Sequence, residues 1–189
     1  MSAFLVHLMR HGAPQTPGLL LGRTDAPSTP GGIAACLERA RALPFDALIA
    51  SDLCRAARAA EAIGEPRGLP VALDPRWREL DFGDWDGLAP EHVERPAMAA
   101  FWDDPDANPP PGGERWSALT ARVDGALAAI PERNTLVVTH GGAIRAALAC
   151  LFGFEQRHLW AFELPYAAVV SLRIWPGAGR TAQIAGLQA

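Results

Sequence analysis

The stretch FLVHLMRHG at residues 4–12 is a short apolar run that ends abruptly in an arginine, a histidine and a glycine. Its length and apolar character are typical of a buried strand. A second stretch, TLVVTHGG at residues 135–142, has the same form, with β-branched residues leading into a histidine and two glycines. The two stretches together predict a sheet in which two buried strands each end at a histidine.

The segments around these two stretches alternate between helical and strand patterns. We expect Thr29 to be the N-cap of one helix and Ser51 or Asp52 to cap the next. With these two, the helices are expected at residues 30–43, 54–63, 91–102, 116–130 and 141–152. Further strands are expected at residues 47–50, 71–73, 169–174 and 182–187, the last two joined by turns at Pro176-Gly177 and Gly179. This alternation predicts an α/β fold, a three-layer α/β/α sandwich with a mostly parallel central sheet.

Composition limits what such a chain can do. Its 189 residues, 49% hydrophobic and 20% charged, predict one globular domain over residues 1–189. The net charge of −4 argues against a general nucleic-acid or membrane binder, so an anion site would have to be a local arginine cluster. All 17 basic residues are arginine, which excludes a P-loop lysine and a Schiff-base lysine.

Targeting and metal signals are missing from the sequence. The stretch Met1–Arg10 is too short and too soon charged for a signal peptide, and no apolar run approaches the roughly 20 residues of a membrane span. The three cysteines are scattered, and neither H-x-H nor H-E-x-x-H spacing occurs. We therefore expect a soluble cytoplasmic protein that uses no metal and no cofactor. The sequence does not indicate an oligomeric state.

Histidines and arginines gather at one predicted edge of the sheet. Ligands of open α/β sheets bind beyond the carboxyl ends of the strands, which is where His11 and His140 are expected. Arg10 adjoins the first histidine, and Arg55 lies in the first turn of the helix after strand 47–50. Guanidinium groups match phosphate oxygens, and the N-terminus of a helix attracts anions. Each feature alone is more often structural, a turn or a solvated helix face, but their joint placement predicts a phosphate pocket with a nucleophile in it.

Four motifs in chain order resemble those of the histidine phosphatase superfamily, which has the phosphoglycerate-mutase-like fold. They are LMRHG at residues 8–12, SDLCRA at 51–56, RELDFGDWDG at 78–87 and VVTHGG at 137–142. The resemblance implies that His11 is the nucleophile and that Glu79 first protonates the leaving oxygen and then deprotonates water. It also implies that Arg10, Arg55 and His140 bind the phosphoryl oxygens, with Gly141 beside them. Phosphoryl transfer of this kind depends on positioning and charge neutralisation, which these side chains can supply.

Some positions depart from common family patterns, which leaves the substrate contacts open. The departures are Ala13, Pro17, Ala59 and Arg115. Thr16, Arg23 or Arg115 are candidates to supply the missing contacts. The expected partner is a small-molecule phosphate ester, with neither nucleic acid nor membrane involved.

Several short motifs resemble the α-ribazole-5′-phosphate phosphatase branch of the superfamily, which acts in cobalamin assembly: GRTD at residues 22–25, FGDWDG at 82–87, WDDP at 102–105 and PPGGE at 110–114. Residues 82–116 are a possible lid that brings Trp85, Trp102 and Trp116 toward the site, where an aromatic base could stack. A broad-specificity sugar-phosphate phosphatase and a phosphoglycerate mutase are the alternatives. A non-catalytic binding protein on the same fold is an alternative of a different class.

Overall fold

A computed structural model describes residues 2–177 and 181–189 of the chain. Within these residues one sheet has the strand order β3-β2-β4-β1-β5-β6. Strands β3, β2, β4 and β1 are parallel, whereas β5 and β6 are antiparallel additions. The bounds are β1 Phe4–Arg10, β2 Ala47–Ala50, β3 Val71–Leu73, β4 Thr135–Thr139, β5 Val169–Trp175 and β6 Thr181–Gln188. The mostly parallel sheet is confirmed; the turn expected at Gly179 lies outside the described residues.

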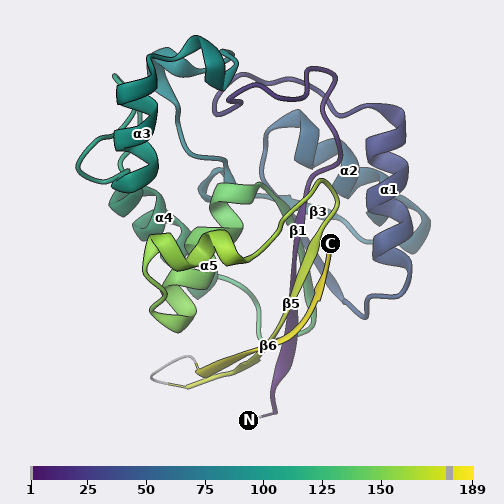
Figure 1. Cartoon of the computed structure of the whole chain (residues 1–189). Helices are drawn as coiled ribbons and strands as arrows, with labels where there is room; N and C mark the ends of the chain where they lie inside the picture. Colours follow the sequence, from purple (N-terminus) through teal and green to yellow (C-terminus); the bar gives the residue numbers. More distant parts are fainter. Residues whose placement is uncertain (1, 178–180) are drawn as a thin grey trace.

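Helices cover both faces of the sheet (Figure 1). Helices α1 and α2 lie on one side, and α3, α4 and α5 lie on the other, which gives the three layers expected from the alternating pattern. The bounds are α1 Pro30–Arg41, α2 Cys54–Gly64, α3 Arg95–Asp103, α4 Trp116–Ala128 and α5 Gly141–Phe152. Each helix lies close to its expected range.

The central strands separate two apolar cores. Val6 and Leu8 of β1 face the core shared with α4 and α5, while Met9 faces the core shared with α1 and α2. All three side chains are fully buried, and each such burial stabilises the fold by about 1.5–3 kcal/mol. Because β1 and β4 are held from both faces, the residues that follow them are fixed in place.

The helix caps match the expectation in one case and not in the other. Thr29 is the N-cap of α1, and its Oγ1 accepts a hydrogen bond of 3.0 Å from the backbone N of Gly32. The cap of α2 expected from Ser51 or Asp52 is wrong, because Leu53 holds that position. Asp25 serves instead, accepting from the backbone N of Cys54 at 2.6 Å. The Asp52 carboxylate is bound by Arg78, and the Ser51 hydroxyl lies against a histidine of the site described below.

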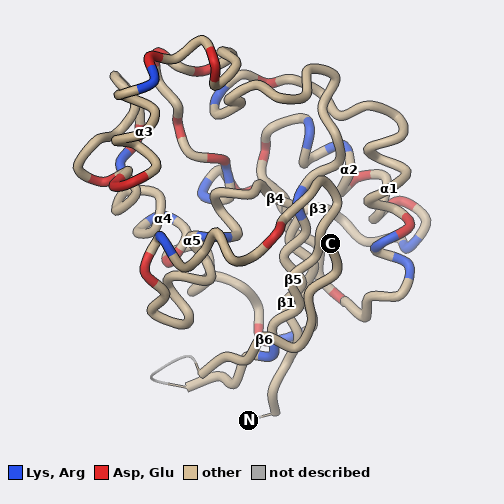
Figure 2. Tube along the Cα trace, viewed as in Figure 1, with Lys and Arg blue, Asp and Glu red and all other residues tan. Residues whose placement is uncertain are grey.

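Charged residues of both signs lie mostly on the helices and loops, whereas β2, β3, β4 and β6 carry none (Figure 2). Among the residues that the structure describes, no helix is long and apolar enough to cross a bilayer. The arginines of the site are therefore distinguished by their hydrogen-bond partners at the ends of the central strands and not by the overall charge.

Candidate active site

The two histidines of the predicted sheet edge lie side by side. Arg10 is in register with Thr139, and the backbone N of His11 donates to the Thr139 carbonyl at 2.8 Å. The rings of His11 and His140 follow directly, with centroids 5.0 Å apart and planes 62° apart. Both side chains are buried. Parallel pairing of β1 with β4 thus brings together two histidines that are far apart in the sequence.

His11 is held as a neutral imidazole with one ring nitrogen available. Its Nδ1 lies 2.7 Å from the carbonyl oxygen of Gly12, which only accepts hydrogen bonds, so Nδ1 carries the proton. Nε2 consequently keeps its lone pair. Burial, followed by the positive charge of Arg55, lowers the pKa of His11 from 6.5 to about 3. The ring is therefore uncharged near pH 7, the form in which imidazole is a nucleophile.

His140 is fixed through both ring nitrogens. Its Nε2 lies 2.8 Å from Oγ of Ser51, and its Nδ1 accepts from Nε of Arg55 at 3.3 Å. All three side chains are fully buried. Burial, and after it the charge of Arg55, holds the pKa of His140 well below its ordinary value. Ser51, expected from the sequence as a possible helix cap, thus lies in the site instead.

Arg55 organises the loop that closes this side of the site. Nη1 donates to the Thr24 carbonyl at 2.8 Å, and Nη2 donates to the carbonyls of Leu21 and Gly22 at 2.8 and 3.0 Å. With Nε directed at His140, these contacts engage four of the five N–H groups that an arginine carries. Arg55 reaches the expected place, but most of its donors are already engaged by the protein.

Arg10 is held differently and keeps more of its donors available. Its Nη1 donates to the Leu164 carbonyl at 2.6 Å, and its guanidinium carbon lies 4.1 Å from the ring centre of Tyr166. Within the described residues its Nε atom is buried without a hydrogen-bond partner. A buried donor without a partner costs free energy. An oxyanion bound beside His11 would satisfy that donor. Tyr166, whose ring also lies 5.6 Å from His11, was missed because no spacing pattern marks it.

Glu79 reaches the site from the loop after β3, and its carboxylate is oriented by backbone groups. Oε2 accepts from the N of Gly142 at 3.0 Å, and Oε1 accepts from the N of Leu80 at 2.9 Å. Arg122 fixes the backbone from behind, since its Nη2 donates to the Glu79 carbonyl at 2.8 Å. The carboxylate is half-buried and faces an open cavity.

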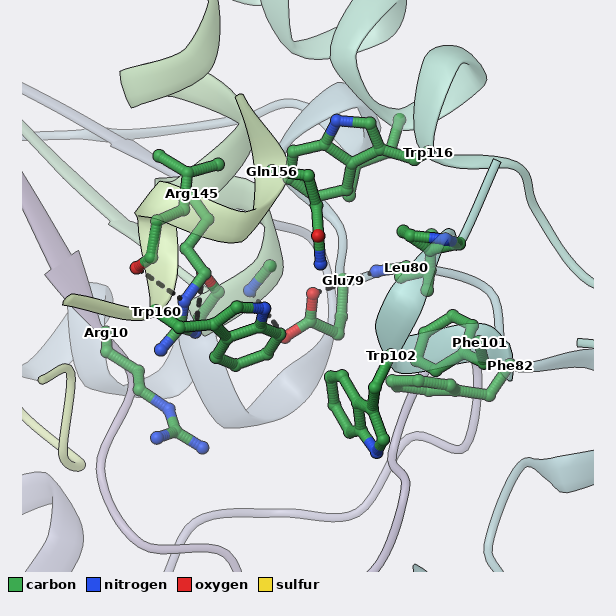
Figure 3. Close-up of a pocket in the computed structure, with 15 residues that line it drawn as sticks. Arg10, Glu79, Leu80, Phe82, Phe101, Trp102, Trp116, Arg145, Gln156 and Trp160 are labelled. Atoms are coloured by element: carbon green, nitrogen blue, oxygen red, sulfur yellow. Dashed lines mark hydrogen bonds between the residues drawn. The ribbon is translucent and has the colours of Figure 1, made fainter. Parts of the chain in front are cut away.

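This cavity has a volume of about 300 Å³, and its lining includes Arg10 and Gly141, the chain neighbours of His11 and His140, but neither histidine. Arg10, Glu79 and Arg145 supply charged groups to its lining, and Figure 3 shows Glu79 among aromatic side chains. The aromatic walls come from Phe82, Phe101, Trp102, Trp116 and Trp160. The rings of Trp102 and Trp160 meet edge to face with centroids 4.8 Å apart, and the two residues are 40% and 45% exposed.

Of the tryptophans expected near the site, Trp102 and Trp116 line this cavity. The expectation for Trp85 is wrong, because its side chain is buried against Phe101 with centroids 5.7 Å apart. Trp160 was missed, since it comes from the 3₁₀ segment Gln156–Ala161, whose sequence shows no motif.

The other candidate contacts lie apart from the cavity lining. Thr16 and Arg23 are exposed, and Arg23 pairs with Asp81 at 3.0 Å. Arg115 is exposed and donates to the Asp106 carbonyl. Gly141 lines the cavity. Arg145 lines it too and was missed, although it stands four residues after Gly141, where a helix brings side chains to the same face.

No group of three or more His, Cys, Asp or Glu side chains suited to a metal ion occurs within residues 2–177 and 181–189. The acidic and basic side chains of the described site are arginines, histidines and the carboxyl group of Glu79.

A family model described as the histidine phosphatase superfamily (branch 1) matches residues 6–185, and the chain belongs to that superfamily. It is 32% identical over 171 residues to the adenosylcobalamin/alpha-ribazole phosphatase of Escherichia coli (strain K12), with 83% of each chain covered. It is 35% identical over 171 residues to "Probable phosphoglycerate mutase GpmB" of Cronobacter sakazakii, with 82% of this chain and 79% of that one covered. A mycobacterial glucosyl-3-phosphoglycerate phosphatase has a similar structure, with a TM-score of 0.85, 25% identity and coverage of 97% and 98%. The family and fold class predicted from the four motifs are confirmed.

Proposed function

We propose that the chain is a phosphomonoester hydrolase that works through a phosphohistidine at His11. The observation that carries this proposal is the state of the His11 ring. It is buried and uncharged, with Nδ1 bound to the Gly12 carbonyl and Nε2 unprotonated. A nucleophile of this kind splits one difficult displacement into two easier ones.

In the first step Nε2 of His11 attacks phosphorus, and the bond from phosphorus to the leaving oxygen breaks. Glu79, as a carboxylic acid, gives that oxygen its proton. In the second step water attacks the phosphohistidine, Glu79 takes a proton from the water, and the phosphorus–nitrogen bond breaks to release phosphate. One carboxyl group alternating between acid and base restores the starting state.

Positive charge and backbone dipoles surround the transferred group in this scheme. Arg10 contributes its unpartnered Nε, and Arg55 contributes its charge and its remaining N–H. The N-terminus of α5 begins at Gly141, beside the histidine pair, where a helix dipole favours an anion. His140 lies beside His11 in this scheme, with its two ring nitrogens held by Ser51 and Arg55.

The cavity beside Glu79 supports a leaving group with an aromatic part. Its walls of tryptophan and phenylalanine suit a planar base, and it opens next to the carboxylate that would protonate the ester oxygen. We propose α-ribazole-5′-phosphate as the first substrate to test. The similarity to the adenosylcobalamin/alpha-ribazole phosphatase of E. coli supports this choice. Residues 82–116, which carry five of the lining residues, would act as the lid.

Two measurements test the proposal. Enzyme quenched in alkali during turnover should carry a covalent phosphoryl group, and acid treatment should release it. His11→Ala should carry no such group. Full turnover by His11→Ala, or an acid-stable phosphoserine, would refute the assignment. No turnover of any phosphate ester, p-nitrophenyl phosphate included, would indicate a non-catalytic binding protein.

A comparison of substrates tests whether the enzyme recognises the aromatic base of the leaving group. α-Ribazole-5′-phosphate should exceed ribose-5-phosphate in kcat/KM by at least about tenfold, or about 1.4 kcal/mol of transition-state binding. Equal values would favour a broad-specificity sugar-phosphate phosphatase. Interconversion of phosphoglycerates primed by 2,3-bisphosphoglycerate, faster than phosphate release, would identify a mutase, which the Cronobacter relative makes the natural second candidate.

A further inference from the structure

Arg145 is a cation of the cavity whose hydrogen bonds are weak. Its guanidinium carbon lies 4.3 Å from the ring centre of Trp160. Its three backbone contacts, to the carbonyls of Leu159, Phe162 and Gly141, measure 3.4, 3.3 and 3.5 Å. These distances exceed the usual range of about 2.7–3.2 Å for N–H···O bonds. Among the ion pairs of the described residues, none includes Arg145.

The position of Arg145 places it on the leaving-group side of the site. It lines the cavity together with Glu79, whereas neither histidine does. A Cβ atom at residue 141 would lie 3.3 Å from Nη1 of Arg145 and 3.7 Å from Nε of Arg10, so the two arginines flank Gly141. Arg10 lies toward His11, which its charge affects, and Arg145 lies toward Trp160. Figure 3 shows the Arg145 guanidinium beside the Trp160 ring, close to the carboxylate of Glu79.

We infer that Arg145 is a specificity-determining residue that hydrogen-bonds an oxygen atom on the leaving group, next to the ester bond. A guanidinium group only donates, so it selects acceptors, and Trp160 holds its plane ready. The substrate class is therefore phosphate esters of polyols or hydroxy acids, in preference to plain alkyl or aryl esters. In a nucleoside 5′-phosphate the ribose oxygens fill this role while the base reaches the aromatic walls. This inference rests on the proposed phosphatase activity.

Three esters of similar size separate the possible acceptors: 3-phosphoglycerate with a carboxylate, glycerol 3-phosphate with hydroxyls only, and propyl phosphate with neither. Phenyl phosphate reports on the aromatic walls. For Arg145→Met we expect kcat/KM to fall about tenfold with glycerol 3-phosphate and about a hundredfold with 3-phosphoglycerate. It should stay within about threefold of wild type with propyl and phenyl phosphate. Arg145→Lys, which keeps the charge, should fall between wild type and Arg145→Met with 3-phosphoglycerate.

Arg157→Met is the matched control, because Arg157 lies on the 3₁₀ segment that carries Trp160 but is exposed and paired with Glu155 at 2.7 Å. It should leave all four values unchanged. A loss confined to 3-phosphoglycerate would support the inference and identify the carboxylate as the acceptor. Equal losses with all four esters would overturn the inference, because a loosened cavity wall or a role at the phosphoryl group would produce them. No loss with any ester would overturn it as well. If the wild type hydrolyses none of the four esters, the proposed function fails and this inference fails with it.

Discussion

A Cβ atom at residue 142 would lie 2.1 Å from Oε1 of Glu79, so the carboxylate occupies the space that a side chain at Gly142 would fill. Gly142→Ala should therefore displace the Glu79 carboxylate. The fold should stay intact, because the nearest atoms that the added atom meets all belong to a side chain that can move. We expect kcat for glycerol 3-phosphate to fall about a hundredfold. Gly31→Ala, where an added Cβ meets nothing within 4 Å, is the control. Unchanged turnover in Gly142→Ala would contradict the position assigned to Glu79.

Glu79→Gln removes the proposed proton donor but keeps the shape of the side chain. Alkyl phosphates have poor leaving groups, so their turnover should fall by roughly 10²–10⁴-fold, whereas activated aryl phosphates should lose less in the first step. The measurement is kcat/KM against leaving-group pKa for both enzymes. Glu61→Gln, an exposed glutamate of α2, should match wild type. A loss independent of the leaving group, with dephosphorylation unaffected, would assign the role elsewhere.

The lowered pKa of His11 predicts a stability that depends on pH. In the unfolded chain this histidine is protonated below about pH 6.5, while in the fold it stays neutral down to about pH 3. Between these values the unfolded state binds more protons, so the free energy of unfolding falls as pH falls. The slope for one such group is up to about 1.4 kcal/mol per pH unit.

His7 and His140 shift in the same direction, so the test is a comparison of variants. Urea unfolding of wild type and His11→Gln should be measured at about pH 7 and about pH 5. The variant should lose less stability over this interval. Parallel pH dependence of the two proteins would show that His11 is not buried as a neutral ring.

The contact between Ser51 and His140 should hold the ring of that histidine in place, since Arg55 donates to Nδ1 and so leaves the proton on Nε2, which faces Ser51. Ser51→Ala removes the partner of Nε2, and we expect kcat/KM to fall about tenfold. The ¹⁵N chemical shift of Nε2 should move, while Nδ1 keeps the shift of an acceptor nitrogen because Arg55 still donates to it. Ser171→Ala is a matched control, because it removes a 2.8 Å contact to Nδ1 of the core residue His7 instead. Unchanged ring shifts in Ser51→Ala would disprove the positioning role.

Exhaustive treatment with EDTA should leave activity unchanged, since the proposed steps rely on arginine, histidine and Glu79 for charge and proton transfer. The assay is phosphate release before and after chelation, with added Mg²⁺ and Zn²⁺ as separate arms. Loss on chelation with recovery on adding either ion would refute a metal-free reaction.

Sequence patterns predicted the frame of the site because that frame depends on short-range signals. Strand ends followed by His-Gly placed His11 and His140 correctly at one edge, and the four motifs identified the family. The cavity walls were harder to predict. Trp85 and Trp102 belong to the same irregular segment, and only tertiary packing decides that one is buried while the other faces the cavity. Trp160 enters from a segment far along the chain, which no local period reveals.

The neighbours of β1 have a consequence for how the chain matures. Within the described residues this strand pairs with β4 and β5, which are synthesised after β2 and β3, whereas β2 and β3 can pair with each other as soon as both are made. A nascent chain that stops before β4 thus carries β1 as an apolar strand without a sheet, and contacts of such long sequence separation form slowly. His11, the proposed nucleophile, is thus synthesised well before β4 and β5, which complete its surroundings. Catalytic competence should therefore arise in one late step, with no partly active intermediate before it.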